Sequence, residues 1–117
     1  MNDSSANSAI ELFDKEGFLR DLDDWNEKLA IQIARQCNID LNDSHWQIVR
    51  LLREFYAAHQ LSPANRALVA LVKRELGPEK GNSAYLLSLF KNPDNNKESP
   101  AKLASKIAGL PKPDNCL

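Results

Sequence analysis

Cysteine and histidine are the residues of this sequence with the widest chemistry, and the chain has two of each. Cys116 is the penultimate residue, whereas Cys37 lies in the first third of the chain. Such a distant pair matches neither the dense spacing of a disulfide scaffold nor a CxxC metal site. We therefore expect both cysteines to be free thiols in a reducing cytosol.

The segment before Cys116 would make its thiol available to another protein. Pro111 and Pro113 alternate in LPKPDNCL, residues 110–117, and their fixed φ favours an extended arm that rises about 3.1 Å per residue. Such an arm could hold Cys116 on the order of 20 Å from the preceding helix. A thiolate can attack a persulfide and take its terminal sulfur by the displacement that exchanges disulfides. We predict that Cys116 is the catalytic residue and carries sulfur as a persulfide.

The alternative is that Cys116 is an incidental residue of a tolerant chain end. A free, exposed cysteine is prone to oxidation and to pairing between molecules, which favours a function. Because an exposed thiol is mostly protonated at neutral pH, its activation would have to come from a partner's pocket. Cys37 follows Leu29 and Ile33 on an apolar stripe, so we expect it to be a small buried hydrophobic residue without chemistry.

The two histidines offer no metal or cofactor site. His45 and His59 fall on one predicted helix about four turns apart at 3.6 residues per turn, too far to share a metal ion. His45, near a helix start, is expected to form a local hydrogen bond. No HExxH, GxGxxG or P-loop pattern is present, and we predict neither a cofactor nor a metal. A cysteine–histidine hydrolase would need a rigidly placed nucleophile, which a penultimate residue does not provide.

Composition indicates one domain that has no strong electrostatic field. The 117 residues are 43% hydrophobic, enough for one modest core. A formal net charge of -1 argues against free nucleic acid as the primary ligand at physiological salt. No window approaches the ~20 apolar residues of a membrane helix, and the first ten residues lack the features of a secretory signal. We expect a cytoplasmic protein.

Hydrophobic periodicity and capping residues predict five helices around one core. They cover residues 24–37, then a second helix that follows the cap candidates Asn42, Asp43 and Ser44 and includes Trp46, Tyr56 and His59, and then residues 63–76, 83–90 and 100–108. The second carries the most large apolar residues and is expected to be the central, largely buried one. Glycines 77 and 109 are expected to end the third and fifth helices. The run KNPDNNKES, residues 91–99, has no apolar residue and is predicted to be an exposed loop.

The remaining segments complete the predicted architecture. Residues 10–22, IELFDKEGFLRDL, place apolar residues around a turn and are typical of a β-hairpin. The fold class is thus mainly α: a five-helix orthogonal bundle with a small N-terminal β-hairpin and a mobile C-terminal arm. We predict a disordered N-terminus over residues 1–9, a single helical domain over 10–108, and an arm over 109–117 that carries Cys116.

Five segments of the sequence resemble a known family. The ending SKIAGLPKPDNC, residues 105–116, is similar to the C-terminal signature of the DsrC/TusE family of sulfur-relay proteins. The other segments are GFLRDLDDW (17–25), HWQIVRLLREFY (45–56), SPANRALV (62–69) and EKGNSAYLLSLF (79–90). The resemblance covers nearly everything from the predicted hairpin onward, and it implies a helical body with a small hairpin and a mobile arm.

The resemblance also implies a function. Members that serve dissimilatory sulfur metabolism carry a second cysteine at the position of Ser105, which can form a disulfide or trisulfide with the last one. Serine cannot do so, and the sequence therefore resembles the single-cysteine TusE type. This type implies a sulfurtransferase, in the sense of a persulfide carrier, that accepts sulfur from a TusBCD-like complex and passes it to an MnmA-like tRNA thiouridylase. The product would be 2-thiouridine at the tRNA wobble position, with tRNA contacted only indirectly and the carrier monomeric when free.

One segment departs from the family pattern. The family runs almost directly from Leu-Phe through Pro and Gly into Pro-Ala-Lys, whereas here residues 91–99 separate Phe90 from Pro100. An insertion in an exposed loop is inexpensive to the fold. If that surface touches a partner, partner choice could differ from that of a typical member.

Other functions stay open at this point. The predicted helices 63–76 and 83–90 could form a helix-turn-helix DNA-binding regulator, although the second offers leucines rather than base-reading side chains. A pure adaptor would use the same body and make Cys116 dispensable. A DsrC-like sulfur-trafficking protein with a different partner is a further alternative.

Overall fold

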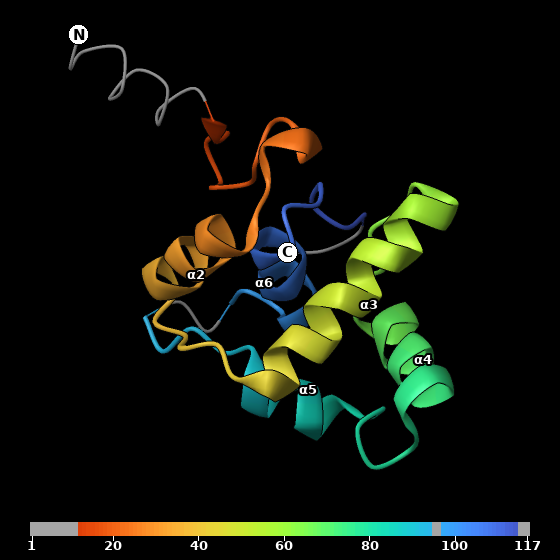
Figure 1. The fold of residues 1–117 in the computed structure, drawn as a ribbon. Helices are drawn as coiled ribbons and strands as arrows, with labels where there is room; N and C mark the ends of the chain where they lie inside the picture. The colour runs from red at the N-terminus through yellow and green to blue at the C-terminus, as the bar shows by residue number, and fades with distance from the viewer. Residues whose placement is uncertain (1–11, 95–96, 115–117) are drawn as a thin grey trace, which may run out of the picture.

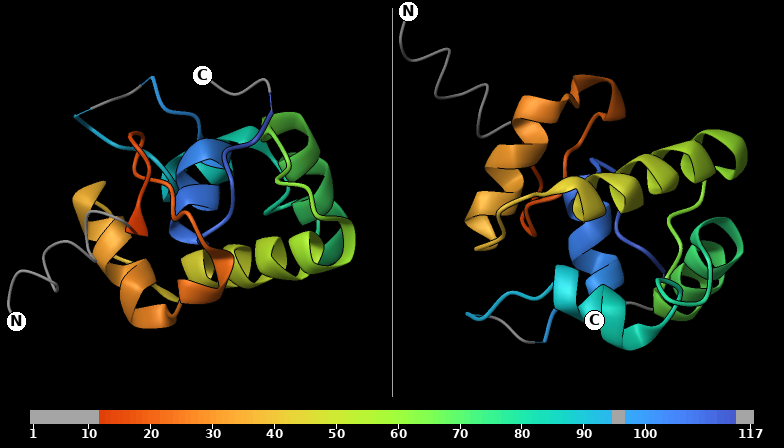
Figure 2. Two further views of the ribbon diagram at one scale, coloured as in Figure 1. Left: turned by 90° about the horizontal axis from the view of Figure 1, so that it is seen from above. Right: turned by 60° about the horizontal axis from the view of Figure 1, so that its bottom comes forward.

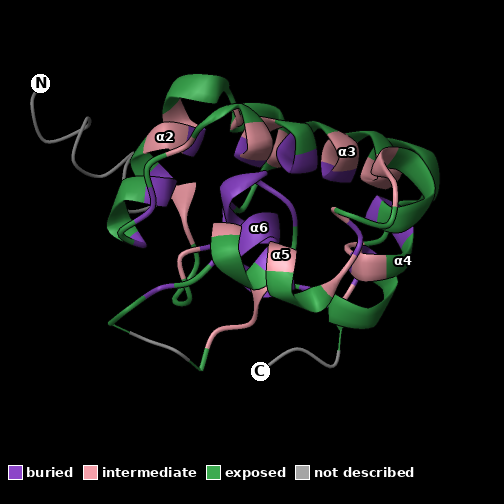
Figure 3. Cartoon of the chain, turned by 90° about the horizontal axis from the view of Figure 1, so that it is seen from below, coloured by how far each residue is buried: buried purple, intermediate pink, exposed green. Residues whose placement is uncertain are grey.

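Helix α6, Pro100–Ile107, is the centre of the fold (Figure 1). In the computed structural model, which describes residues 12–94 and 97–114, α6 contacts each of the other four α-helices. These are α2 (Glu27–Gln36), α3 (Asp43–His59), α4 (Asn65–Leu76) and α5 (Ser83–Leu89). Every residue from 101 to 110 is buried, and the buried colour accordingly covers α6 in Figure 3. Figure 2 shows the other helices arranged around it.

The sequence of α6 explains why so short a helix can be enclosed. Alanines or serine at positions 101, 104, 105 and 108 let neighbouring helices approach from several sides, while Leu103 and Ile107 fill the space between them. Ser99 caps the first turn by accepting a hydrogen bond from the Lys102 amide, and proline follows it. The prediction that the second helix is the central one is therefore wrong. That helix, α3, buries Ile48, Val49 and Leu52 but leaves its outer face exposed.

The outer helices follow the predicted periodicity, with shifts at their first residues. Asn42 and Asn82 cap α3 and α5 with their side chains. The first helix begins at Glu27 rather than at residue 24, because the side chain of Asn26 accepts a hydrogen bond from the Leu29 amide and caps it there. The third begins at Asn65 and not at Pro63, after Ala64, which offers no side-chain cap.

The predicted N-terminal hairpin is not confirmed. In the described part of the chain the segment contains one antiparallel bridge, between Phe13 and Leu19, and no strand. The turn is held by Asp14, whose carboxylate accepts hydrogen bonds from the amides of Glu16 and Phe18. A 3₁₀ turn, Leu22–Asp24, then leads into α2. The side chain of Phe18 is buried, so the turn packs on the body although it forms no sheet.

The loop predicted at residues 91–99 is not wholly exposed. Asn92 is 8% exposed, and the amide group of Asn38, just after α2, donates to Asn92 Oδ1 at 3.3 Å and to Asp94 Oδ2 at 2.7 Å. Asparagine can both donate and accept, so an apparently polar loop can be fixed to a helix end without any apolar residue.

The mainly helical prediction is confirmed by five α-helices within the described residues. None of those helices is long and apolar enough to cross a membrane. The predicted disordered segment, residues 1–9, lies outside the described part of the chain.

Candidate functional site

Of the two thiols, Cys37 lies within the described residues. Cys116, the predicted catalytic residue, lies outside the described residues, which end at Asp114. Cys37, at the C-cap of α2, is 5% exposed, as predicted for a core residue. Burial raises the pKa of the Cys37 thiol, and the nearby Lys106 ammonium offsets this only in part. Cys37 therefore stays a neutral, enclosed thiol at neutral pH and is a poor nucleophile.

The arm that leads to Cys116 begins with a defined turn at the end of α6. Gly109 has a φ of 74°, in the left-handed region, and its amide donates to the Lys106 carbonyl at 3.1 Å. The Leu110 amide donates to the Ser105 carbonyl at 2.9 Å. This pair of bonds is the Schellman motif, and it fixes the direction in which the chain leaves the helix.

Two long side chains hold the last carbonyl groups of α6. Trp25 Nε1 donates to the Ile107 carbonyl at 2.9 Å, and Arg53 Nη1 of α3 donates to the Ala108 carbonyl at 2.6 Å. The Arg53 guanidinium also lies 3.9 Å from the centroid of the Trp25 ring, a cation–π contact. Burial lowers the pKa of Arg53, but from so high a starting value that the group stays charged. Both donors therefore act as one cap over a helix end that is closed to water.

After Gly109 the chain runs along the body instead of away from it. Leu110 is 1% exposed and belongs to the core, and Pro113 is also buried. Lys112 Nζ lies 3.1 Å from Glu16 Oε1 in the N-terminal turn. The prediction that the arm projects from the body is thus wrong for Leu110 and Pro113, because both side chains are buried against it. The mobility of the arm stays a prediction.

A network of charges joins the arm, α6 and the N-terminal turn. Lys106 Nζ lies 2.9 Å from Glu98 Oε2, and Lys102 Nζ lies 3.3 Å from Glu16 Oε1. The side chains of both lysines are about nine-tenths buried, so unpaired ammonium groups would be strongly unfavourable there. The pKa of Glu16 is lowered chiefly by its hydrogen bond to Lys112 and next by the one to Lys102. The Lys112 contact is therefore present above the titration range of Glu16 and is lost in acid.

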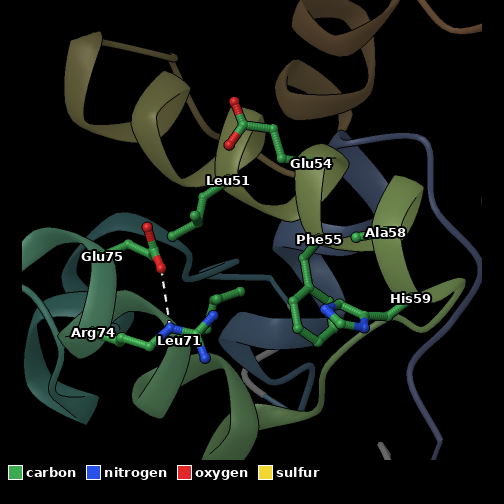
Figure 4. A pocket seen from close by; sticks show the side chains of 8 residues that line it. All are labelled: Leu51, Glu54, Phe55, Ala58, His59, Leu71, Arg74 and Glu75. Atoms are coloured by element: carbon green, nitrogen blue, oxygen red, sulfur yellow. Dashed lines mark hydrogen bonds and ion pairs between the residues drawn. The ribbon is translucent and has the colours of Figure 1, made fainter.

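The histidines and the groove between α3 and α4 lie apart from this arrangement. His45 accepts from the Asn42 amide at 3.0 Å and bonds the Leu89 carbonyl at 2.8 Å, which confirms the predicted local role. His59 packs on Phe55 in the groove of Figure 4 and is not brought near His45. Arg74 and Glu75 pair with each other at the α4 side of that groove. No thiol and no residue of the arm lines it.

Several residues that organise the arm were not identified from the sequence. Trp25 and Arg53 contact the end of α6, and nothing in their local sequence indicates this. Neither role has a local signal, since each contact joins residues far apart in the chain. The positive φ of Gly109, by contrast, agrees with the predicted end of the fifth helix.

Comparison with known proteins gives a consistent result. The profile of the family described as "DsrC like protein" matches residues 5–117. Sulfurtransferase TusE of Sodalis glossinidius is 49% identical over 89% of this chain and 91% of its own length, and the TusE of Salmonella typhimurium is 47% identical over 89% and 90%. The NMR structure of Allochromatium vinosum DsrC has a TM-score of 0.77 at 46% identity, over 90% of this chain and 88% of that one. The oxidized γ-subunit of dissimilatory sulfite reductase (DsrC) from Archaeoglobus fulgidus has a TM-score of 0.71 at 37% identity, over 90% of each chain.

The turn at Gly109 predicts a specific sensitivity to substitution. A Cβ at this position would overlap the Trp25 indole ring, and an L-residue at positive φ costs at least about 1–2 kcal/mol in addition. Gly17 is a matched control, because its φ is 89° but a Cβ there would meet only ordinary contacts with Lys106. We expect Gly109→Ala to lower the free energy of unfolding in denaturant by clearly more than Gly17→Ala. Equal losses would show that Trp25 does not constrain the arm.

The Arg53 cap can be tested in the same way. Arg53→Met keeps most of the apolar stem but leaves the Ala108 carbonyl without its donor, which should cost about 1–3 kcal/mol. Arg50→Met is the control on the same helix, since Arg50 is exposed and lies 6.0 Å from the Trp46 centroid; we expect its effect to stay within about 0.5 kcal/mol. Thermal unfolding of both variants measures the difference. A loss no larger for Arg53→Met than for Arg50→Met would argue against the cap.

Proposed function

This chain belongs to the family of DsrC-like proteins, and we propose that it is a sulfur carrier that accepts and donates persulfide sulfur on Cys116. Its relatives are named sulfurtransferases, which supports a transferase role for this chain. The observation that carries the assignment to Cys116 is the burial of Cys37. Of the chain's two thiols, Cys37 is enclosed and weakly acidic. Cys116 is therefore the remaining thiol that could exchange sulfur with a partner protein.

The proposed reaction is a balanced sulfur exchange. The Cys116 thiolate attacks the terminal sulfur of a donor R–S–SH and forms Cys116–S–SH, while the bond between the donor's two sulfurs breaks and R–S⁻ leaves and takes up a proton. One S–S bond forms as another breaks, so no external oxidant or reductant is consumed. Donation to the next protein is the same step in reverse roles, and the partner that binds the arm decides the direction.

Ser105 supports a mechanism that uses a single thiol. This residue is fully buried in α6, and its hydroxyl has no hydrogen-bond partner in the described part of the chain. A hydroxyl cannot take part in the sulfur exchange, so an internal bridge between this position and Cys116 has no chemistry to support it. We propose that sulfur moves only between proteins: from a TusBCD-like donor complex to Cys116, and from there to an MnmA-like thiouridylase that forms 2-thiouridine at the wobble position of tRNA. The proposed compartment is the cytoplasm.

The helix-turn-helix alternative gains no support from α5. Leu86 is buried, and the exposed residues of this seven-residue helix are Ser83, Ala84, Leu87 and Ser88. None is an arginine, lysine, asparagine or glutamine, the side chains that form bidentate contacts with base edges in the major groove. The other alternative is a pure adaptor, which binds its partners without exchanging sulfur. The following experiment distinguishes it from a sulfur carrier.

Two variants separate the role of the arm thiol from that of the core thiol. Cys116→Ser should keep the fold but abolish both persulfide loading and tRNA thiolation, because oxygen cannot replace sulfur in the exchange. Cys37→Ala should do the reverse: loading is kept, and unfolding becomes easier by on the order of 1 kcal/mol, as for the loss of a small buried group. Loading is measured by intact mass after incubation with a cysteine desulfurase and the donor complex, and stability by thermal unfolding.

Normal loading of Cys116→Ser would refute the carrier assignment. Normal tRNA thiolation with an unloaded Cys116→Ser protein would instead indicate an adaptor. Loss of loading in a folded Cys37→Ala protein would show that the core thiol takes part in the exchange.

A further inference from the structure

A groove runs beside the arm, just before the point where the arm reaches Cys116. Pro111, Lys112 and Asp114 line one side, and the other side comes from the end of α3 and the loop to α4, with Tyr56 and Leu61. Figure 1 shows the dark-blue arm next to this light-green loop. We call this hollow the arm-side groove. Because Leu110 and Lys112 contact the body, the two sides of the groove form one continuous surface in this structure.

The groove combines polar lining residues, among them Gln60 and Asp114, with one large apolar side chain, Leu61, that the fold leaves exposed. Leu61 is 57% exposed, and Leu87 of α5, at 46%, is the other large hydrophobic residue exposed in the described part of the chain. One exposed leucine is common on a protein surface and does not by itself mark an interface. Its place distinguishes Leu61, since Tyr56 and Pro111 line the same hollow and extend the apolar surface to the arm.

The covalent length of the chain determines what must lie over this groove. Cys116 follows Asp114 by two residues, and two residues span at most about 7 Å. A specific interface usually buries about 800 Å² on each partner, which corresponds to a disc of roughly 16 Å radius. A protein that brings its own reactive sulfur to Cys116 therefore covers the protein surface around Asp114. This surface includes the arm-side groove.

We propose that the arm-side groove is the docking surface for the protein that exchanges sulfur with Cys116. This inference rests on the proposed function and adds the place where the partner binds. The partner supplies an apolar side chain, next to its own reactive cysteine, that packs on Leu61 and removes this leucine from water. The Schellman turn, the buried Leu110 and the Lys112–Glu16 pair place residues 109–114 beside the groove before a partner binds.

Leu87 provides a matched control. It lies in a second groove with Val69, Leu86 and Pro100, which has no lining residue in common with the arm-side groove. That groove contains no residue of the arm, so a partner that docks on the arm-side groove need not contact Leu87. The two exposed leucines therefore test position while residue type and exposure are kept similar.

The experiment compares Leu61→Glu with Leu87→Glu in the full chain. For each variant the rate of persulfide loading on Cys116 is measured by intact mass with two donors: the persulfide-loaded TusBCD-like complex, and glutathione persulfide, which is too small to need the groove. We expect the ratio of the protein-donor rate to the small-donor rate to fall at least about tenfold in Leu61→Glu, as for an interface hot spot. In Leu87→Glu the ratio should stay within about twofold of the original, as for a neutral surface change.

The outcomes separate this inference from the proposed function. An unchanged ratio in Leu61→Glu, or an equal fall in both variants, would overturn the docking surface while leaving the carrier in place. Failure of the unmodified chain to load from either donor would overturn the proposed function and the docking surface with it. Thermal unfolding of each variant, together with Leu61→Ala as a milder substitution expected to lower the ratio in the same direction, shows that the effect does not come from unfolding.

Discussion

A buried helix must find donors for its last carbonyl groups, because water cannot reach them. In this protein the helix is α6, and the donors are the Trp25 indole and the Arg53 guanidinium, which stack on each other. Since α6 contacts all the other described α-helices, its closed end is a condition for the whole core. The same two bonds join the segment before α2 and the middle of α3 to the start of the C-terminal arm.

That arrangement gives the arm two parts with different tasks. Residues 109–114 are fixed to the body by the turn at Gly109, by the buried Leu110 and by the pair of Lys112 with Glu16. The thiol lies two residues further on, so the covalent distance from a fixed point is short. In the proposed function, a partner recognises the surface around residues 109–114 before any bond is exchanged. Selectivity can then come from the folded surface, while the chemistry needs one cysteine.

Much of the fold follows from local sequence signals, and the anchorage of the arm does not. Helix periodicity, the caps at Asn42 and Ser99 and the stop at Gly109 depend on neighbours in the chain, as does the burial of Cys37 on its stripe. The roles of Trp25 and Arg53 depend on residues 82 and 55 positions away, which no local pattern encodes. Lysines 102 and 106 are charged and would be expected at the surface; they are buried because Glu98 and Glu16 come together around them in three dimensions. The predicted hairpin is not confirmed for a related reason, since a turn that packs its Phe18 on the body needs no ladder of strands.

The most direct test of the account is to locate the transferred sulfur in the unmodified protein. The chain is incubated with a donor whose persulfide sulfur is isotopically labelled, digested without reductant, and analysed by peptide mass mapping. We expect one labelled sulfur atom on the C-terminal peptide that contains Cys116, released by a thiol reductant, and none on the peptide that contains Cys37. Label on the Cys37 peptide, or no label on either peptide while the donor complex is active, would contradict it.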